Sequence, residues 1–169
     1  MGERSPAPTI EIRPVTHDDL ERLIDIYLDT AIHHAAIDPA WFQVPARDDV
    51  AVRLRRRIDG RGEDGEYVAA MLDRQMVGSA TISVEDAPHP GSMMRPIRTA
   101  EFGVSVVDGH RGLGIGRALI GHLEGWAADH GVERIILNVA EANTGAIRLY
   151  HELGYVDYDR AMRKDIGPA

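Results

Sequence analysis

The chain has 169 residues, of which 44% are apolar and 27% charged, and its formal net charge is −8 at pH 7. This composition is typical of an ordinary globular protein and excludes a disordered or collagenous chain. The acidic balance argues against nucleic acid as a partner, because binding to phosphates needs a basic surface. The sequence holds no cysteine, which excludes disulfide bonds, a thiolate metal site and a covalent cysteine thioester.

No stretch of the sequence approaches the roughly 18 uninterrupted apolar residues of a membrane-spanning helix. The first residues lack the apolar core of a secretory signal. We therefore expect a cytoplasmic protein without a membrane partner. Residues 1–8 are predicted to be a short flexible N-terminus, and residues 9–169 a single domain.

The first predicted elements are a short strand at residues 9–14 and a helix that begins near Thr16. Apolar residues recur in this helix at spacings of three and four, which gives it one face to pack on a sheet. A second helix is predicted at about residues 46–57. Its basic run is more typical of a solvated helix face than of an anion site, and consists of Arg53, Arg55, Arg56 and Arg57.

Two strands follow at residues 67–72 and 76–84, and a tight connection joins them. Beyond a proline-containing loop, a strand at residues 100–107 leads through a glycine-rich turn into a helix. The chain is then predicted to continue with further elements: a helix at 114–130, a strand at 134–140, a helix at 143–153 and one or two strands within 155–166. This order predicts an α/β fold of the mixed α+β type, with a central mixed sheet of about six or seven strands flanked by about four helices.

The glycine-rich turn reads Arg111-Gly112-Leu113-Gly114-Ile115-Gly116. At a helix start several N–H groups lack partners and the helix dipole is positive, so this junction can bind an anion. The dinucleotide pattern G-x-G-x-x-G fails, because its third glycine would fall on Arg117 or Leu119, and no Gly-Lys pair exists for the ATP-binding pattern. The turn fits R-x-x-G-x-G instead. A purely structural strand-to-helix connection is the alternative.

In this turn the sequence resembles the GNAT superfamily of acyl-CoA-dependent N-acyltransferases. The opening Ile12-Arg13-Pro14, followed by an acidic helix, is similar to the usual beginning of that family. The family's downstream pattern N-x-x-A-x-x-L-Y-x-x-x-G-[FY] is matched at the expected distance by Asn143, Ala146, Leu149, Tyr150, Gly154 and Tyr155. Together these matches extend from about residue 10 to residue 166.

The resemblance implies an enzyme that moves an acetyl group from acetyl-CoA directly to a primary amine. In the family, the amides of the turn wrap the CoA pyrophosphate, and the backbone of the preceding strand binds the pantetheine and polarises the thioester carbonyl. The residues implied to bind the cosubstrate are Val104, Ser105, Val106, Arg111, Gly112, Leu113, Gly114, Ile115, Gly116, Arg117, Asn143 and Tyr150.

The resemblance also implies catalytic roles. Tyr150 is the expected general acid, because the matching tyrosine of relatives points at the CoA sulfur; core packing is the alternative. Asn143 can cap its helix, contact the pantetheine, or do both. Glu101 is the expected general base, since Asn138 stands where some relatives carry an acid. Weaker candidates for the base, beside proton loss through ordered water, are Glu85, Glu141 and His110.

No metal ion is expected, because the adjacent His33 and His34 diverge on a helix and cannot easily chelate one ion. The expected acceptor is a small-molecule amine, although a protein N-terminus or lysine also fits. A homodimer is a further expectation, because dimers are common among relatives. The competing hypothesis is a CoA-binding regulatory protein that has lost turnover. Acceptor specificity is expected in residues 32–47, in residues 87–96 and in the final strands.

Overall fold

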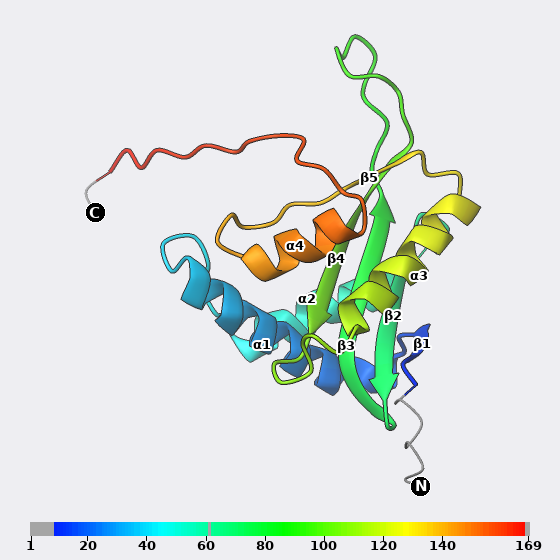
Figure 1. The fold of residues 1–169 in the computed structure, drawn as a ribbon, viewed down its shortest axis with the longest axis vertical. Helices are drawn as coiled ribbons and strands as arrows, with labels where there is room; N and C mark the ends of the chain where they lie inside the picture. The colour runs from blue at the N-terminus through cyan, green and yellow to red at the C-terminus, as the bar shows by residue number, and fades with distance from the viewer. Residues whose placement is uncertain (1–8, 61, 168–169) are drawn as a thin grey trace, which may run out of the picture. The chain divides into compact units, whose positions relative to one another are not determined.

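The computed structural model describes residues 9–60 and 62–167 (Figure 1). Within this range the chain forms two compact units, one that ends at Asn138 and one that begins at Val139. The predicted flexible segment at residues 1–8 lies outside the described residues.

The first unit is built on a five-stranded sheet whose strands lie in sequence order. The strands are β1 (Glu11–Pro14), β2 (Gly65–Leu72), β3 (Gln75–Val84), β4 (Thr99–Val106) and β5 (Arg134–Ile136). Strands β1 to β4 pair antiparallel with their neighbours, whereas β4 pairs in parallel with β5. A parallel pair needs a crossover connection, and the helix between these two strands supplies it.

Three helices flank this sheet: α1 (Leu20–Ile37), which follows a short 3-10 turn η1 (His17–Asp19), α2 (Arg47–Asp59) and α3 (Ile115–Asp129). Helix α3 covers one face of the sheet (Figure 1). Gly78 of β3 lies close against this helix, since a Cβ added there would lie 3.3 Å from side-chain atoms of Ile115 and Leu119. The opposite face packs on α1 and α2 in a core that includes Leu23, Ile24, Val50, Leu54, Tyr67 and Ala69. The expected mixed α/β class is confirmed.

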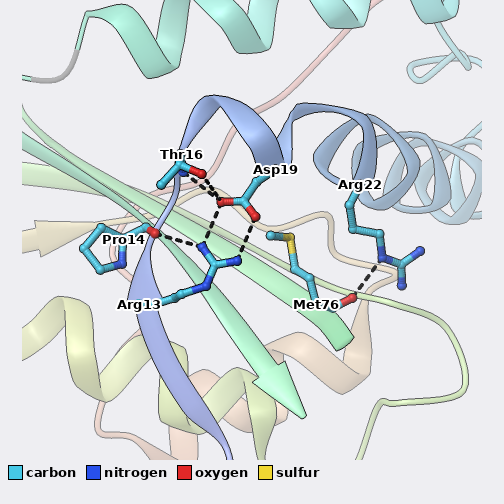
Figure 2. Close-up of polar contacts among 6 residues, drawn as sticks. All are labelled: Arg13, Pro14, Thr16, Asp19, Arg22 and Met76. Atoms are coloured by element: carbon cyan, nitrogen blue, oxygen red, sulfur yellow. Dashed lines mark hydrogen bonds and ion pairs between the residues drawn. The ribbon is translucent and has the colours of Figure 1, made fainter. Parts of the chain in front are cut away.

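A part-buried ion pair fixes the junction between β1 and α1 (Figure 2). The Asp19 carboxylate accepts hydrogen bonds from both terminal nitrogens of Arg13, at 2.8 and 2.7 Å, and from the backbone N–H of Thr16 at 2.8 Å. These bonds, those from Arg13 above all, lower the pKa of Asp19 to about 2. Further along α1, Arg22 Nε donates to the carbonyl oxygen of Met76 at 2.9 Å, which ties the helix to the start of β3.

The turn between β2 and β3 has two residues, because Leu72 pairs directly with Gln75. The two residues between them, Asp73 and Arg74, have φ angles of 48° and 66°. Left-handed conformation at both central positions is the type I′ geometry, which matches the twist of the paired strands.

The second unit contains α4 (Thr144–Glu152) and the extended chain after it. The prediction of terminal strands within residues 155–166 is wrong for the described residues, since no strand follows α4. The sheet therefore has five strands and not six or seven. A strand needs a paired edge for its backbone groups as well as an apolar pattern, and here the large apolar side chains are exposed at Val156, Tyr158, Met162 and Ile166.

The predicted strand at residues 134–140 is also too long, because β5 ends at Ile136. No helix in the part of the chain that the structure describes is both long and apolar enough to cross a membrane.

Candidate functional site

The turn between β4 and α3 depends on glycine for its conformation. Gly109, Gly112 and Gly114 have φ angles of 81°, 78° and 82°, in the left-handed region that other residues rarely adopt. A Cβ built on any of the three would meet no atom within 4 Å. Backbone conformation, and not crowding, therefore requires glycine here, and the backbone of the turn stays open to a ligand.

Helix α3 begins directly after Gly114 and has no side-chain cap. Its first turn contains no acidic residue and includes Arg117, while the buried Ile115 anchors that turn to the core. The first N–H groups of a helix have no intrahelical partners, and the dipole is positive at this end. The junction thus has the chemistry of an anion site, and Arg111 and Arg117 add positive charge on either side of it.

Backbone hydrogen bonds at the two ends of β4 show which of its residues direct their polar backbone groups toward β3. Val107 N–H donates to Val77 at 2.9 Å, and Glu85 N–H donates to Thr99 at 2.8 Å. In an antiparallel pair, residues that exchange hydrogen bonds alternate with residues whose polar groups point to the other side. The odd-numbered residues of β4 therefore bond to β3, and the even-numbered residues direct their N–H and C=O groups toward β5.

Strand β5 pairs with β4 only as far as Glu101. Beyond that point the backbone N–H and C=O groups of Val104 and Val106 point toward a side on which, within the described part of the chain, no strand of the sheet continues. The backbone groups of Ser105 lie on the opposite side, in the ladder with Ser79. An extended amide-bearing ligand could therefore bond to the edge of β4 at Val104 and Val106.

Glu101 shares its sheet face with Gly103 and Ser105, and this is the face on which α1 and α2 pack. Its side chain is exposed, and Asn138 Nδ2 donates to its Oε1 at 3.3 Å. A solvent-accessible carboxylate is thus held at the last residue of β4 that pairs with β5.

Helix α1 contacts the glycine turn at two points. The Asp108 backbone N–H donates to Asp29 Oδ2 at 2.9 Å. One Arg111 guanidinium nitrogen lies 3.0 Å from His33 Nδ1 and 3.2 Å from Nε2. Partial burial, and then the charge of Arg111, lower the pKa of His33, which favours the neutral imidazole that can accept this bond.

Neither Asp29 nor the contact of His33 with Arg111 was expected from sequence. The only available signal is that Asp29 and His33 stand four residues apart, on one helix face. Thr30 follows Asp29 in the sequence, and His110 precedes Arg111. The Thr30 Oγ1 and His110 Nδ1 atoms are buried and have no hydrogen-bond partner among the described residues.

The remaining predicted site residues, Asn143 and Tyr150, belong to the second unit. Asn143 caps α4, since its side-chain oxygen accepts from the Ala146 N–H at 3.3 Å. The Tyr150 ring packs edge-on against Tyr155, with centroids 5.9 Å apart. Burial raises the pKa of Tyr150 above its ordinary value, so its hydroxyl stays a proton donor well into the alkaline range.

The segments expected to set specificity differ in their exposure. The Phe42 ring packs on His34 with centroids 5.1 Å apart, whereas Trp41 is 66% exposed. In the loop between β3 and β4, Met93 and Met94 are also exposed. His33 and His34 meet edge to face, and within the described residues no three His, Cys, Asp or Glu side chains gather where a metal could bind.

A family model described as the acetyltransferase (GNAT) family matches residues 21–155. The chain is 33% identical over 97 residues to streptothricin acetyltransferase of Streptomyces lavendulae, covering 56% of this chain and 47% of that protein. It is 32% identical over 144 residues to mycothiol acetyltransferase of Frankia alni, covering 73% of this chain and 40% of that protein. The chain thus spans less than half the length of these two curated relatives.

Solved structures share the fold. A tetramutant of the BH1408 protein of Bacillus halodurans superposes with a TM-score of 0.83 at 22% identity, covering 92% of this chain and 99% of the other. Aminoglycoside N-acetyltransferase AAC(6′)-Iy in complex with CoA superposes with a TM-score of 0.68 at 17% identity, covering 98% and 99%.

Proposed function

The chain belongs to the acetyltransferase (GNAT) family, and from this premise we propose that it transfers an acetyl group from acetyl-CoA directly to a primary amine. The observation that carries the proposal is the glycine turn, which leads from the unpaired edge of β4 into the uncapped start of α3. This junction offers backbone N–H groups to a phosphate and a free strand edge to an amide chain.

For the cosubstrate, the pyrophosphate would bind the N–H groups between Gly112 and Gly116, with Arg111 and Arg117 adding charge. The two amides of the pantetheine would continue along β4 and bond to the backbone of Val104 and Val106. Ser105 would contribute through its side chain, because its backbone groups are used in the pairing with β3. The solved relative AAC(6′)-Iy, which holds CoA on the same fold, supports this assignment.

For the chemistry, the acceptor amine must lose a proton, because a lysine-like amine has a pKa of about 10.4. Glu101 would take that proton, directly or through a water molecule. An N–H group of β4 would stabilise the negative charge that develops on the carbonyl oxygen. Tyr150 would donate a proton to the departing CoA thiolate, for which its raised pKa keeps the hydroxyl protonated.

We propose a small-molecule amine as the acceptor. Two curated relatives are named for streptothricin and mycothiol, and one solved relative for aminoglycosides, none of which is a protein. The net charge of −8 and the exposed Glu101 carboxylate suit a cationic acceptor.

Calorimetric titration with acetyl-CoA tests the cosubstrate site. The informative variant is Gly114→Glu, which places a carboxylate at the proposed pyrophosphate position. Gly131→Glu is the matched control, because Gly131 has a φ of 68°, is equally open around its Cβ and lies past the opposite end of α3. Both variants carry the same left-handed strain, so only the position of the charge differs.

We expect saturable binding by the native protein and by Gly131→Glu, and none by Gly114→Glu. Thiol release in the presence of a panel of aminated small molecules would then identify acceptors. A folded native protein that does not bind acetyl-CoA would refute the proposal, and binding without thiol release toward any amine would favour the regulatory alternative.

A further inference from the structure

Helix α1 contacts the glycine turn at its start, at Asp108, and in its middle, at Arg111, which is also a proposed contact of the cosubstrate. We infer that Asp29 and His33 are positioning residues, which dock the turn on α1 and hold it in the conformation that binds the cosubstrate. The inference rests on the proposed function.

Asp29 fixes the start of the turn. The ladder with β3 extends to Val107, whose N–H bonds to Val77, and the next N–H, that of Asp108, bonds to Asp29 Oδ2 at 2.9 Å. From Gly109 to Gly114 the turn contains three glycines in left-handed conformations. Glycine has more accessible conformations than any other residue, so a turn of this kind is ordered at a high entropic cost unless an outside contact restrains it.

His33 fixes the middle of the turn at Arg111. Its ring nitrogens lie 3.0 and 3.2 Å from one guanidinium nitrogen, so the unprotonated nitrogen can accept the bond. The charged and titratable groups around this imidazole are Arg111, His34, Asp108 and Asp29. The contact thus restrains Arg111, the residue that directly precedes Gly112 in the turn.

The two contacts form a pair because Asp29 and His33 stand one helical turn apart on α1. Between the contacting residues in sequence, Thr30 Oγ1 and His110 Nδ1 are buried and have no hydrogen-bond partner among the described residues. The positions of Asp108 and Arg111 thus depend on two side chains of a helix whose first half is packed in the core. A turn ordered in advance loses less entropy when a ligand binds, which raises affinity without a new ligand contact.

Two substitutions at Asp29 and two at His33 separate the loss of the hydrogen-bond acceptor from the loss of the native side chain. Asp29→Ala removes both the charge and the acceptor, whereas Asp29→Asn removes the charge and keeps an acceptor oxygen. His33→Ala removes the acceptor, and His33→Gln keeps one. We expect the alanine variants to bind CoA about 5-fold more weakly than their amide counterparts, as the loss of one hydrogen bond worth about 1 kcal/mol implies.

Asp25→Ala is the matched control, because Asp25 stands one turn earlier on α1 and accepts a bond from Arg47 of α2 at 2.8 Å, away from the turn. CoA affinity should be unchanged in this variant. Amide hydrogen exchange supplies a readout besides affinity: the Asp108 N–H should exchange faster in Asp29→Ala than in Asp29→Asn, and equally in Asp25→Ala and the native protein. In turnover, the KM for acetyl-CoA should rise while kcat at saturation stays constant.

Equal CoA affinity in each alanine and amide pair, with native CoA binding intact, would overturn this inference and leave the proposed function standing. Failure of the native protein to bind CoA would refute both, so the two results can be told apart.

Discussion

At the scale of the residue, Asp19 shows how a local contact sets a pH dependence. Its side chain is 11% exposed and accepts hydrogen bonds from Arg13 and from the backbone N–H of Thr16. All of these bonds favour the ionised form, which is why the pKa of Asp19 falls to about 2 from an ordinary value of 3.8. In the unfolded chain these partners are absent and the ordinary value returns.

A lowered pKa in the folded state means that the stabilisation is complete above the unfolded pKa and is lost as the pH falls toward the folded one. We expect ionised Asp19 to contribute about 2 kcal/mol to the free energy of unfolding at pH 7, about half of it lost by pH 3. Urea unfolding of the native protein and Asp19→Asn between pH 7 and pH 3 measures this. A difference between the two proteins that does not change with pH would contradict the argument.

Tyr150 supports a kinetic prediction under the proposed function. Tyr150→Phe should lower kcat about 100-fold, the smaller end of the range for a lost general acid, because a thiolate leaves readily. Acetyl-CoA affinity should change little. Tyr155→Phe is the control, since the two rings pack together and each variant loses one hydroxyl. Steady-state kinetics check this, and equal kcat values for the two variants would assign Tyr150 to packing.

The sequence allowed the glycine turn to be predicted, because left-handed positions and an uncapped helix start need residue types that are visible in a short stretch. The contacts of Asp29 with Asp108 and of His33 with Arg111 could not be predicted. They join residues 79 and 78 positions apart, and no local pattern links them. Likewise the direction of the Val104 and Val106 backbone groups follows from the pairing register, which only the structure provides.

At the scale of the element, the predicted bounds of α2, α3 and α4 lie within two residues of the observed ones, and those of β2, β3 and β4 agree as closely, whereas only the start of the first helix was predicted, near Thr16, and α1 begins at Leu20 after a 3-10 turn. The predictions failed for residues 137–140 and 155–166, which have strand-like sequences and no strand to pair with in the described chain. A strand depends on a partner, whereas a helix satisfies its own backbone, so strand ends are harder to read from sequence.

The β2–β3 turn gives a prediction of stability at this scale. A left-handed φ costs a residue other than glycine about 1–2 kcal/mol, and introducing glycine costs about 0.5–1 kcal/mol through the unfolded chain. Arg74→Gly should therefore stabilise the protein by roughly 0.5–1 kcal/mol, and Arg74→Ala should not. Thermal unfolding of both variants measures the difference, and equal melting temperatures would show that the turn is not under strain.

The free edge of β4 gives a second prediction at the scale of the element, on hydrogen exchange. In the protein without ligand, the Val104 and Val106 amides should exchange with solvent faster than those of Gly103 and Ser105, which bond to β3. Saturating CoA should slow the exchange of Val104 and Val106 and leave the other two unchanged. Hydrogen exchange followed by NMR reports each amide separately. Protection by CoA that does not alternate along the strand would show that the pantetheine does not lie on this edge.

At the scale of the whole molecule, the prediction of one domain at residues 9–169 requires that the two units unfold together. The described residues of the second unit include no fully buried side chain, and α4 has only nine residues. A helix this short is not stable alone in water. We therefore expect α4, whose half-buried apolar residues are Ala146, Ile147, Leu149 and Tyr150, to lose its helical order when the first unit unfolds.

This dependence predicts a single cooperative transition. Trp41 and Trp126, the only two tryptophans, lie in the first unit, and a single dye can be attached to the second at Arg148→Cys because the native chain has no cysteine. Urea unfolding followed by tryptophan fluorescence and by the dye should give coincident midpoints, as two-state unfolding requires.

Dye and tryptophan midpoints should also rise together when acetyl-CoA is added, since a ligand that binds only the folded protein stabilises everything that unfolds with its site. An earlier dye transition that acetyl-CoA does not move would instead make residues 139–169 a separate unit, and would remove Tyr150 from the proposed chemistry.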